Sequence, residues 1–217
     1  MTTPHQHDTH PFYAGHGSPQ ERSGAGKRPL RVLMVCTGNI CRSTMAEQVL
    51  RESAERAGVQ HLVEVDSAGI SDEALGRLMD PRAARVLAGA GYQVPTHRAR
   101  QVTAQELSQW DLVLAMTSRH LDALIRLAQA GGITRGEPLG GQASKTSGVA
   151  ANTAEGQNTA TSEGPRGVAL QRFRDFDPSG TGDVPDPWYG THQDFLDTLD
   201  TIERVTPELL ALLHERA

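Results

Sequence analysis

The chain has 217 residues, a formal net charge of −5 and a hydrophobic content of 37%. This length suits one domain with additional segments, and the hydrophobic content is low for a fully packed chain, so part of it is expected to be disordered. The negative charge argues against a broad surface for nucleic acid or anionic membranes. The sequence has no apolar run that could span a bilayer, and its two cysteines form no disulfide framework, so a cytoplasmic protein is expected.

Residues 1–28 form a polar N-terminal segment rich in His, Pro and Gly. This composition predicts a disordered tail and lacks the apolar core of a secretory signal. The tail histidines are compatible with adventitious binding of a transition metal, although a flexible polar tail is the simpler interpretation. They include His5, His7, His10 and His16.

From Leu30 onward, the sequence predicts alternating strands and helices. The predicted strands span 30–36, 61–66, 112–116 and 168–170. The predicted helices span 43–57, 80–89, 103–109, 121–127 and 191–214. This alternation predicts an α/β fold, with a small parallel sheet of about four strands and helices on both faces.

Two further segments shape the expected domain organisation. Large apolar residues almost disappear between 131 and 167, so about 135–166 is interpreted as a flexible, low-complexity insertion. The last predicted helix carries an apolar stripe, for which packing on the sheet is favoured over binding a partner. The stripe consists of Phe195, Leu199, Ile202, Leu209 and Leu213.

A thiol, Cys36, and a guanidinium, Arg42, flank a short polar loop between the first predicted strand and the first predicted helix. Gly38 and Asn39 tolerate the left-handed backbone that turns loop amides inward, and a helix N-terminus attracts anions. Arg42 adds a planar fork suited to two phosphate oxygens. A cysteine can also simply close a strand as a small buried residue. The combination of Cys36, the polar loop and Arg42 between a strand and a helix instead predicts a phosphate-binding site that faces a thiolate nucleophile.

From Val35 to Glu47, the sequence resembles the signature of the low-molecular-weight protein tyrosine phosphatases, Cys-x5-Arg-Ser followed by Met-Ala-Glu. Further segments resemble this family in the same order, at 65–69, 80–83, 97–101, 111–116 and 183–190. The resemblance implies a phosphatase domain over 29–217 that hydrolyses phosphotyrosine in proteins without a metal or other cofactor. A monomer is expected, and, from the negative charge and the lack of an apolar run, one without nucleic-acid or membrane partners.

The resemblance implies a role for each matching residue. Cys36 would attack phosphorus, Arg42 would stabilise the equatorial oxygens, and Asp186 would act as general acid and later as base. By itself, the segment around Asp186 would be interpreted as a turn. The expected substrate-binding residues are Thr37, Gly38, Asn39, Ile40, Cys41, Ser43, Trp188 and Tyr189. The expected loop-supporting residues are Ser67 and His97, together with Asn39.

Two of these residues have further expected roles. Ser43 is expected to cap the first helix, to hydrogen-bond the nucleophile, or to do both. The resemblance implies that oxidation joins Cys36 and Cys41 in a reversible disulfide.

The sequence departs from the family pattern at three positions. An acid or a small residue, Glu73 or Ala74, stands where relatives often carry an aromatic residue beside the pocket, which weakens the expected binding of phosphotyrosine. Thr117 replaces a usual Asp, which is expected to loosen the support of the loop. Thr44 replaces a usual Pro, a change that the first turn of a helix accepts.

The sequence bears on three alternative functions. Arsenate reduction coupled to thioredoxin requires cysteines beyond Cys41, and the sequence has none, so this function stays open only with a low-molecular-weight thiol as the partner. Relatives that hydrolyse phosphoarginine carry Thr at the position of Ile40, and the larger Ile favours phosphotyrosine. A non-catalytic module that binds phosphorylated ligands would not need Cys36, Arg42 and Asp186 together.

Overall fold

The computed structural model describes residues 28–141 and 167–216. The predictions for the N-terminal tail and for most of the insertion concern residues outside these ranges. The strands are β1 (Leu30–Cys36), β2 (Val63–Gly69), β3 (Leu112–Ala115) and β4 (Ala169–Arg172). The α-helices are α1 (Arg42–Arg56), α2 (Pro81–Gly89), α3 (Ala104–Leu107), α4 (Ser118–Ala130) and α5 (His192–Arg216), and the 3₁₀ turns are η1 (Gln60–Leu62) and η3 (Phe173–Phe176).

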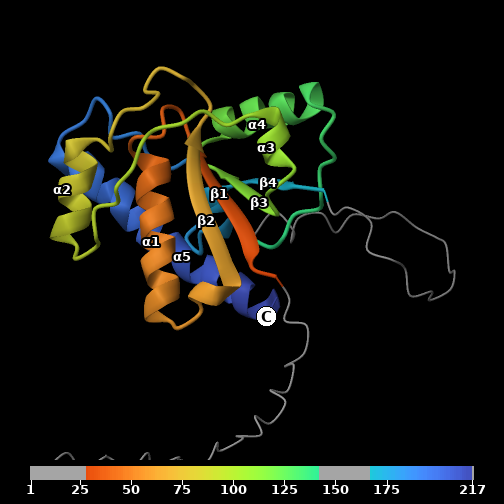
Figure 1. Cartoon of the computed structure of the whole chain (residues 1–217). Helices are drawn as coiled ribbons and strands as arrows, with labels where there is room; N and C mark the ends of the chain where they lie inside the picture. Colours follow the sequence, from red (N-terminus) through yellow and green to blue (C-terminus); the bar gives the residue numbers. More distant parts are fainter. Residues whose placement is uncertain (1–27, 142–166, 217) are drawn as a thin grey trace, which may run out of the picture.

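The four strands form one parallel sheet in the order β2-β1-β3-β4. Figure 1 shows the sheet between two groups of helices, with α1 and α5 on one side and α3 and α4 on the other. The predicted fold class is therefore confirmed. In this arrangement the carboxyl end of β1, where Cys36 lies, opens into a loop at an edge of the sheet that commonly binds ligands.

The two faces of β1 contribute to separate hydrophobic cores. Val32 and Met34 pack into the core that contains α1, α2 and α5, whereas Leu33 and Val35 pack into the core beneath α4. On α5, the predicted apolar stripe is buried at Phe195, Leu199, Ile202 and Leu209. These four side chains confirm that α5 packs on the domain, and each buried large apolar side chain contributes about 1.5–3 kcal/mol.

The second strand differs from its prediction at both ends. The predicted strand over 61–66 is wrong at its start, because residues 60–62 form the 3₁₀ turn η1. It also ends later, because β2 pairs with β1 from Leu30↔Val63 to Cys36↔Gly69. Pairing with a buried neighbour extends the strand through Ser67-Ala68-Gly69, a sequence without strong strand preference. This extension brings Ser67 beside the loop that follows Cys36.

The first residues of the predicted insertion are in contact with β4. Arg135 forms an isolated parallel bridge with Val168. The side-chain amide of Gln171 accepts a hydrogen bond from Leu139 N–H at 2.8 Å and donates one to the Gly140 carbonyl at 2.9 Å. Residues 135–141 thus line the sheet beside β4, and the rest of the predicted insertion lies outside the described residues.

Asp177 anchors the segment that runs from η3 toward Asp186. Its side chain is fully buried and accepts hydrogen bonds from Arg174 at 2.8 Å and from Arg204 of α5 at 3.0 and 2.9 Å. Burial alone would raise the pKa of Asp177, but hydrogen bonds from Arg204, Ser179 and Arg174 outweigh it and hold that pKa well below its ordinary value. This network fixes the start of the loop that carries Asp186. Within 28–141 and 167–216, none of the helices is long and apolar enough to cross a bilayer.

Candidate active site

The loop from Cys36 to Arg42 connects the end of β1 to the first turn of α1. Asn39 adopts the left-handed conformation, with φ of 55°, whereas Gly38 does not. Backbone bonds from Ile70 N–H to Cys36 O (2.9 Å) and from Ser71 N–H to Thr37 O (3.0 Å) tie the loop to the residues after β2. Glycine is required at 69, because a Cβ there would lie 2.6 Å from Thr37 O. The loop backbone is therefore held tightly against the end of β2.

Ser43 contacts the thiol of Cys36 and does not cap the helix. Its Oγ lies 3.1 Å from Cys36 Sγ and accepts a hydrogen bond from Asn39 Nδ2 at 3.2 Å. The helix begins at Arg42 with Cys41 at the N-cap position, and no side chain caps it. The predicted capping role is therefore wrong, because Ser43 lies inside the first turn. Since a thiolate can only accept, the Ser43 hydroxyl is the donor when Cys36 is ionised.

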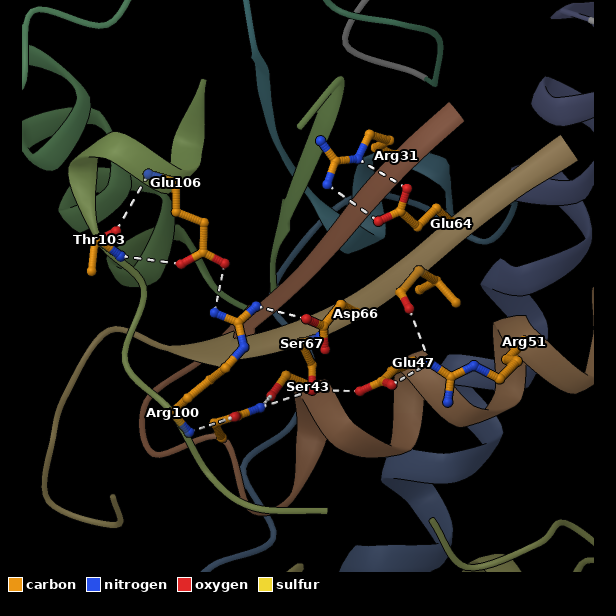
Figure 2. Close-up of polar contacts among 12 residues, drawn as sticks. Arg31, Ser43, Glu47, Arg51, Glu64, Asp66, Ser67, Arg100, Thr103 and Glu106 are labelled. Carbon is orange, nitrogen blue, oxygen red and sulfur yellow. Dashed lines mark hydrogen bonds and ion pairs between the residues drawn. The ribbon is translucent and has the colours of Figure 1, made fainter. Parts of the chain in front are cut away.

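A buried chain of hydrogen bonds supports Asn39. Its Nδ2 donates to Ser67 Oγ at 2.8 Å, and Ser67 in turn donates to Glu47 Oε2 at 2.6 Å. Arg51 donates to Glu47 at 2.6 Å and completes this chain, which Figure 2 shows along the first turns of α1. On the other side, His97 Nε2 lies 2.6 Å from Asn39 O. The structure thus brings together Asn39, Ser67 and His97 as expected, and adds Glu47 and Arg51.

Arg100 is a second support that the sequence analysis did not identify. Its backbone N–H donates to Asn39 Oδ1 at 3.0 Å, while its guanidinium donates to Asp66 at 2.8 Å and contacts Glu106 (Figure 2). Glu106 also forms the capping box of α3 with Thr103. The side-chain amide of Asn39 is therefore bonded at both its oxygen and its nitrogen. Glu47 and Arg100 both lie in segments that resemble the family, which was the available signal for them.

A cavity of about 240 Å³ lies above the loop. Loop residues line one part of it, and two segments distant in the sequence line the remainder. The lining residues are Cys36, Thr37, Gly38, Ile40, Cys41, Arg42, Glu73, Ala74, Arg77, Asp186, Trp188 and Tyr189. The three predicted catalytic residues therefore face one cavity.

Asp186 lies directly beside Arg42 in this cavity. Its Oδ2 is 2.7 Å from Arg42 Nη2, and the Arg42 side chain is only 6% exposed, compared with 55% for Asp186. The loop of Asp186 is held by Val184 N–H, which donates to Met116 O at 2.8 Å, and by Asp183, which accepts from Ser118 N–H at 2.7 Å. A carboxyl group that is half exposed at the rim can reach a leaving group, whereas the buried guanidinium can hold a phosphate.

Trp188 forms an apolar wall of the cavity. It packs against Ile40, Ala74 and Ala99, and the guanidinium of Arg82 lies 5.4 Å from the centroid of its ring. Arg82 also donates to the Trp188 carbonyl at 3.1 Å. An aromatic face of this kind suits stacking on a phenyl ring. By contrast, Tyr189 is 97% exposed and extends the rim rather than the wall.

The departures from the family pattern have structural counterparts. Ala74 is buried beneath the pocket wall, Glu73 lies exposed at the rim, and Arg77, which the sequence analysis did not single out, also lines the cavity. Thr117 caps α4, because its Oγ1 accepts a hydrogen bond from His120 N–H at 3.2 Å. The rim therefore carries the negative side chain of Glu73 and the positive side chain of Arg77. They lie near the position where relatives often carry an aromatic residue.

Two further ionisable side chains adjoin the loop. Burial, then the negative charge of Cys36 and that of Asp80, raise the pKa of the Cys41 thiol far above its usual range. Cys41 is therefore a neutral thiol at physiological pH. His120 Nε2 lies 2.9 Å from Thr37 Oγ1, and burial followed by the charge of Arg42 lowers the pKa of His120 to about 4. His120 was not among the residues expected at the site.

The family model for low molecular weight phosphotyrosine protein phosphatases matches residues 31–134. A low molecular weight protein-tyrosine-phosphatase from Streptomyces coelicolor is 39% identical over 189 residues, which cover 86% of this chain and 94% of the relative. The low molecular weight protein-tyrosine phosphatase A of Mycobacterium bovis is 35% identical over 192 residues, covering 87% of this chain and 94% of the relative.

Solved structures have the same fold. YfkJ from Bacillus subtilis superimposes with a TM-score of 0.65 at 26% identity, over 88% of this chain and 98% of that one. A protein tyrosine phosphatase from Entamoeba histolytica gives a TM-score of 0.64 at 24% identity, over 86% of this chain and 97% of that one. Since two relatives at 35–39% identity match over almost their whole length, the chain belongs to the low-molecular-weight protein-tyrosine phosphatase family.

Proposed function

We propose that this protein hydrolyses phosphotyrosine monoesters in proteins through a cysteinyl-phosphate on Cys36. The observation that carries the proposal is the position of Arg42 and Asp186, 2.7 Å apart, in the same cavity as Cys36. This arrangement supplies a nucleophile, a cradle for the phosphate oxygens and a proton donor within one pocket. Phosphate monoesters react extremely slowly unaided, so all three contributions are needed.

In the first step, the Cys36 sulfur attacks phosphorus in line with the phenolic oxygen. The S–P bond forms as the P–O bond to the tyrosine breaks, and Asp186 gives its proton to the departing oxygen. Arg42 and the backbone amides of the loop hold the three remaining oxygens. A bound dianion competes with Asp186 for the Arg42 guanidinium, which frees the carboxyl group to turn toward the leaving oxygen.

In the second step, Asp186 accepts a proton from a water molecule whose oxygen attacks phosphorus. The S–P bond breaks and releases inorganic phosphate, and the sulfur leaves as a thiolate. The Ser43 hydroxyl, 3.1 Å from this sulfur, donates a hydrogen bond that stabilises the departing charge. The protein returns to its initial state without a redox change or a cofactor.

The alternative functions are less well supported by the residues of the site. The arginine phosphatase YwlE has the same fold at 23% identity, with a TM-score of 0.61, and this likeness concerns the fold alone. Here Ile40 and Trp188 give the cavity an apolar surface that suits a phenyl ring. The proposed chemistry requires Cys36 as a free thiol, which fits the reducing cytoplasm.

A comparison of peptide substrates tests this proposal. We expect kcat/KM to be greater for a phosphotyrosyl peptide than for phosphoseryl and phosphoarginyl versions of the same peptide, by on the order of 100-fold. Phosphate release measures each rate. The variant Ile40→Thr is the matched control, because it removes apolar surface from the pocket and should narrow the preference for tyrosine. Equal rates on all three peptides, or fastest release from phosphoarginine, would contradict the proposed substrate class.

A second expectation concerns oxidation of the site. Cys36 and Cys41 are both buried free thiols that line the same cavity. Brief peroxide treatment should inactivate the protein by forming a Cys36–Cys41 disulfide, and dithiothreitol should restore activity. Intact-mass measurement with alkylation should then find no free thiol in the inactive form. In Cys41→Ser, recovery should be largely lost, since Cys36 oxidises further. Two alkylatable thiols in the inactive wild type would refute this bond.

A further inference from the structure

His120 is a buried ionisable residue that the proposed mechanism does not use. It lies in the first turn of α4 and is 3% exposed. Its Nε2 contacts Thr37 Oγ1 at 2.9 Å, and Thr37 directly follows the nucleophile in the chain. Because α4 covers the opposite face of the sheet from α1, this contact reaches the loop from a different element than the network around Asn39 (Figure 1).

The burial of His120 determines which ring nitrogen carries the proton. His120 Nδ1 has no hydrogen-bond partner among the described residues. A proton on Nδ1 would leave a buried N–H donor without an acceptor, and such a donor carries the full free-energy cost of its removal from water. A proton on Nε2 is instead donated to Thr37 Oγ1 and leaves only a lone pair unmatched. The second tautomer is therefore favoured.

The charged groups around His120 keep its ring neutral. Arg42 at the start of α1 and Arg119 on the same helix oppose a positive charge on the ring, whereas Asp183 and Asp186 favour one. Burial is the largest effect, and together with Arg42 it lowers the pKa of His120 to about 4. At neutral pH the imidazole is thus a fixed donor and not a titrating group.

We propose that His120 is a positioning residue that orients the hydroxyl group of Thr37 toward the phosphate. Because the Thr37 oxygen accepts from His120 Nε2, the hydroxyl proton of Thr37 remains available for another acceptor. Thr37 lines the cavity together with Cys36 and Arg42, so its hydroxyl proton can be donated to a non-bridging oxygen of a phosphate bound there. The inference rests on the proposed function, since it requires that phosphate binds above Cys36.

Paired variants test this role. His120→Leu removes the donor with little change in volume, and Thr37→Val removes the hydroxyl while keeping its shape. Each should reduce kcat/KM for p-nitrophenyl phosphate and weaken competitive inhibition by inorganic phosphate about tenfold, the effect of one hydrogen bond of ordinary strength. The double variant should be no worse than either single variant, because both act on the same bond. His120→Gln, which retains an N–H donor, should recover most of the loss.

The shape of the pH–rate profile is the second readout. It should be the same for wild type and His120→Gln around neutral pH, because the native ring does not titrate there. The positioning role would be overturned if the losses in kcat/KM of the two single variants multiply in the double variant. It would also be overturned if one limb of the pH–rate profile disappears when His120 is replaced. If His120→Leu fails to fold, Thr37→Val serves as the test. Unchanged inhibition by phosphate in Thr37→Val also overturns the positioning role. Wild type that neither hydrolyses p-nitrophenyl phosphate nor binds phosphate would instead refute the proposed function.

Discussion

Replacing Cys36 by Ser is expected to reduce the turnover of p-nitrophenyl phosphate by at least about 10⁴-fold, because a hydroxyl group is a much poorer nucleophile and leaving group than a thiolate. A hydroxyl is far less ionised than a thiol at neutral pH, and Ser43 beside it is a hydrogen-bond donor rather than a base. The cavity and Arg42 remain in place, so inorganic phosphate should still bind to this variant. Steady-state kinetics and calorimetric titration with phosphate measure the two effects separately.

Cys41→Ser is the matched control for this experiment. Cys41 lines the same cavity, but its thiol is protonated in the native protein because burial and nearby negative charges raise its pKa. Turnover by reduced Cys41→Ser should therefore remain within a few-fold of wild type, an effect typical of a small change beside the site. If Cys41→Ser instead lost activity while Cys36→Ser retained it, the nucleophile would be wrongly assigned.

Removing the acid by Asp186→Ala should depress turnover by about 10²–10⁴-fold on phenyl phosphate, whose leaving oxygen is strongly basic. The loss should be smaller on p-nitrophenyl phosphate, since p-nitrophenolate departs without protonation more easily. Phosphate binding should not weaken and should instead become tighter, because Arg42 loses the carboxylate that lies 2.7 Å away. The expected signature is thus a fall in kcat without a rise in KM.

Asp186→Asn separates proton transfer from structure. The amide keeps the shape of the carboxyl group and can still contact the loop, but it cannot supply a proton. Its kcat should fall to a level similar to that of Asp186→Ala, with the same dependence on the leaving group. If both variants lost equal activity on phenyl and p-nitrophenyl phosphate, Asp186 would support the fold of the loop rather than act as the acid.

Local patterns in the sequence were sufficient to predict the sheet, most helices and the phosphate loop. The helix over Arg42–Arg56 follows from a run of good helix formers without Gly or Pro, and the left-handed Asn39 follows from its short polar side chain. The predicted capping by Ser43 failed because the helix begins at Arg42, two residues earlier than a cap at Ser43 requires, and the Ser43 side chain contacts Cys36 instead. The capping residue depends on which residue begins the helix, and the sequence does not predict that residue to within one position.

The end of β2 could not be predicted from propensity. Ser67 lies just beyond the end of the predicted strand over 61–66, yet pairing with β1 places it in the sheet, where it connects Asn39 to Glu47. The role of Glu47 was equally hidden, because a Glu on an amphipathic helix usually faces solvent. The hydrogen bond between Ser67 and Glu47 became apparent only in the tertiary structure, because the two residues lie in different elements.

The sequence by itself determined the loop after Cys36, the choice of Cys36 as the proposed nucleophile and the family resemblance, because these depend on residues adjacent in the chain. Only the tertiary structure decided which distant side chains meet there. Asp186 reaches Arg42 across 144 positions, and His120 reaches Thr37 across 83. Parallel strands bring their carboxyl ends to one edge of the sheet, and so the groups that complete the site are assembled by strand order, which neighbouring residues do not encode.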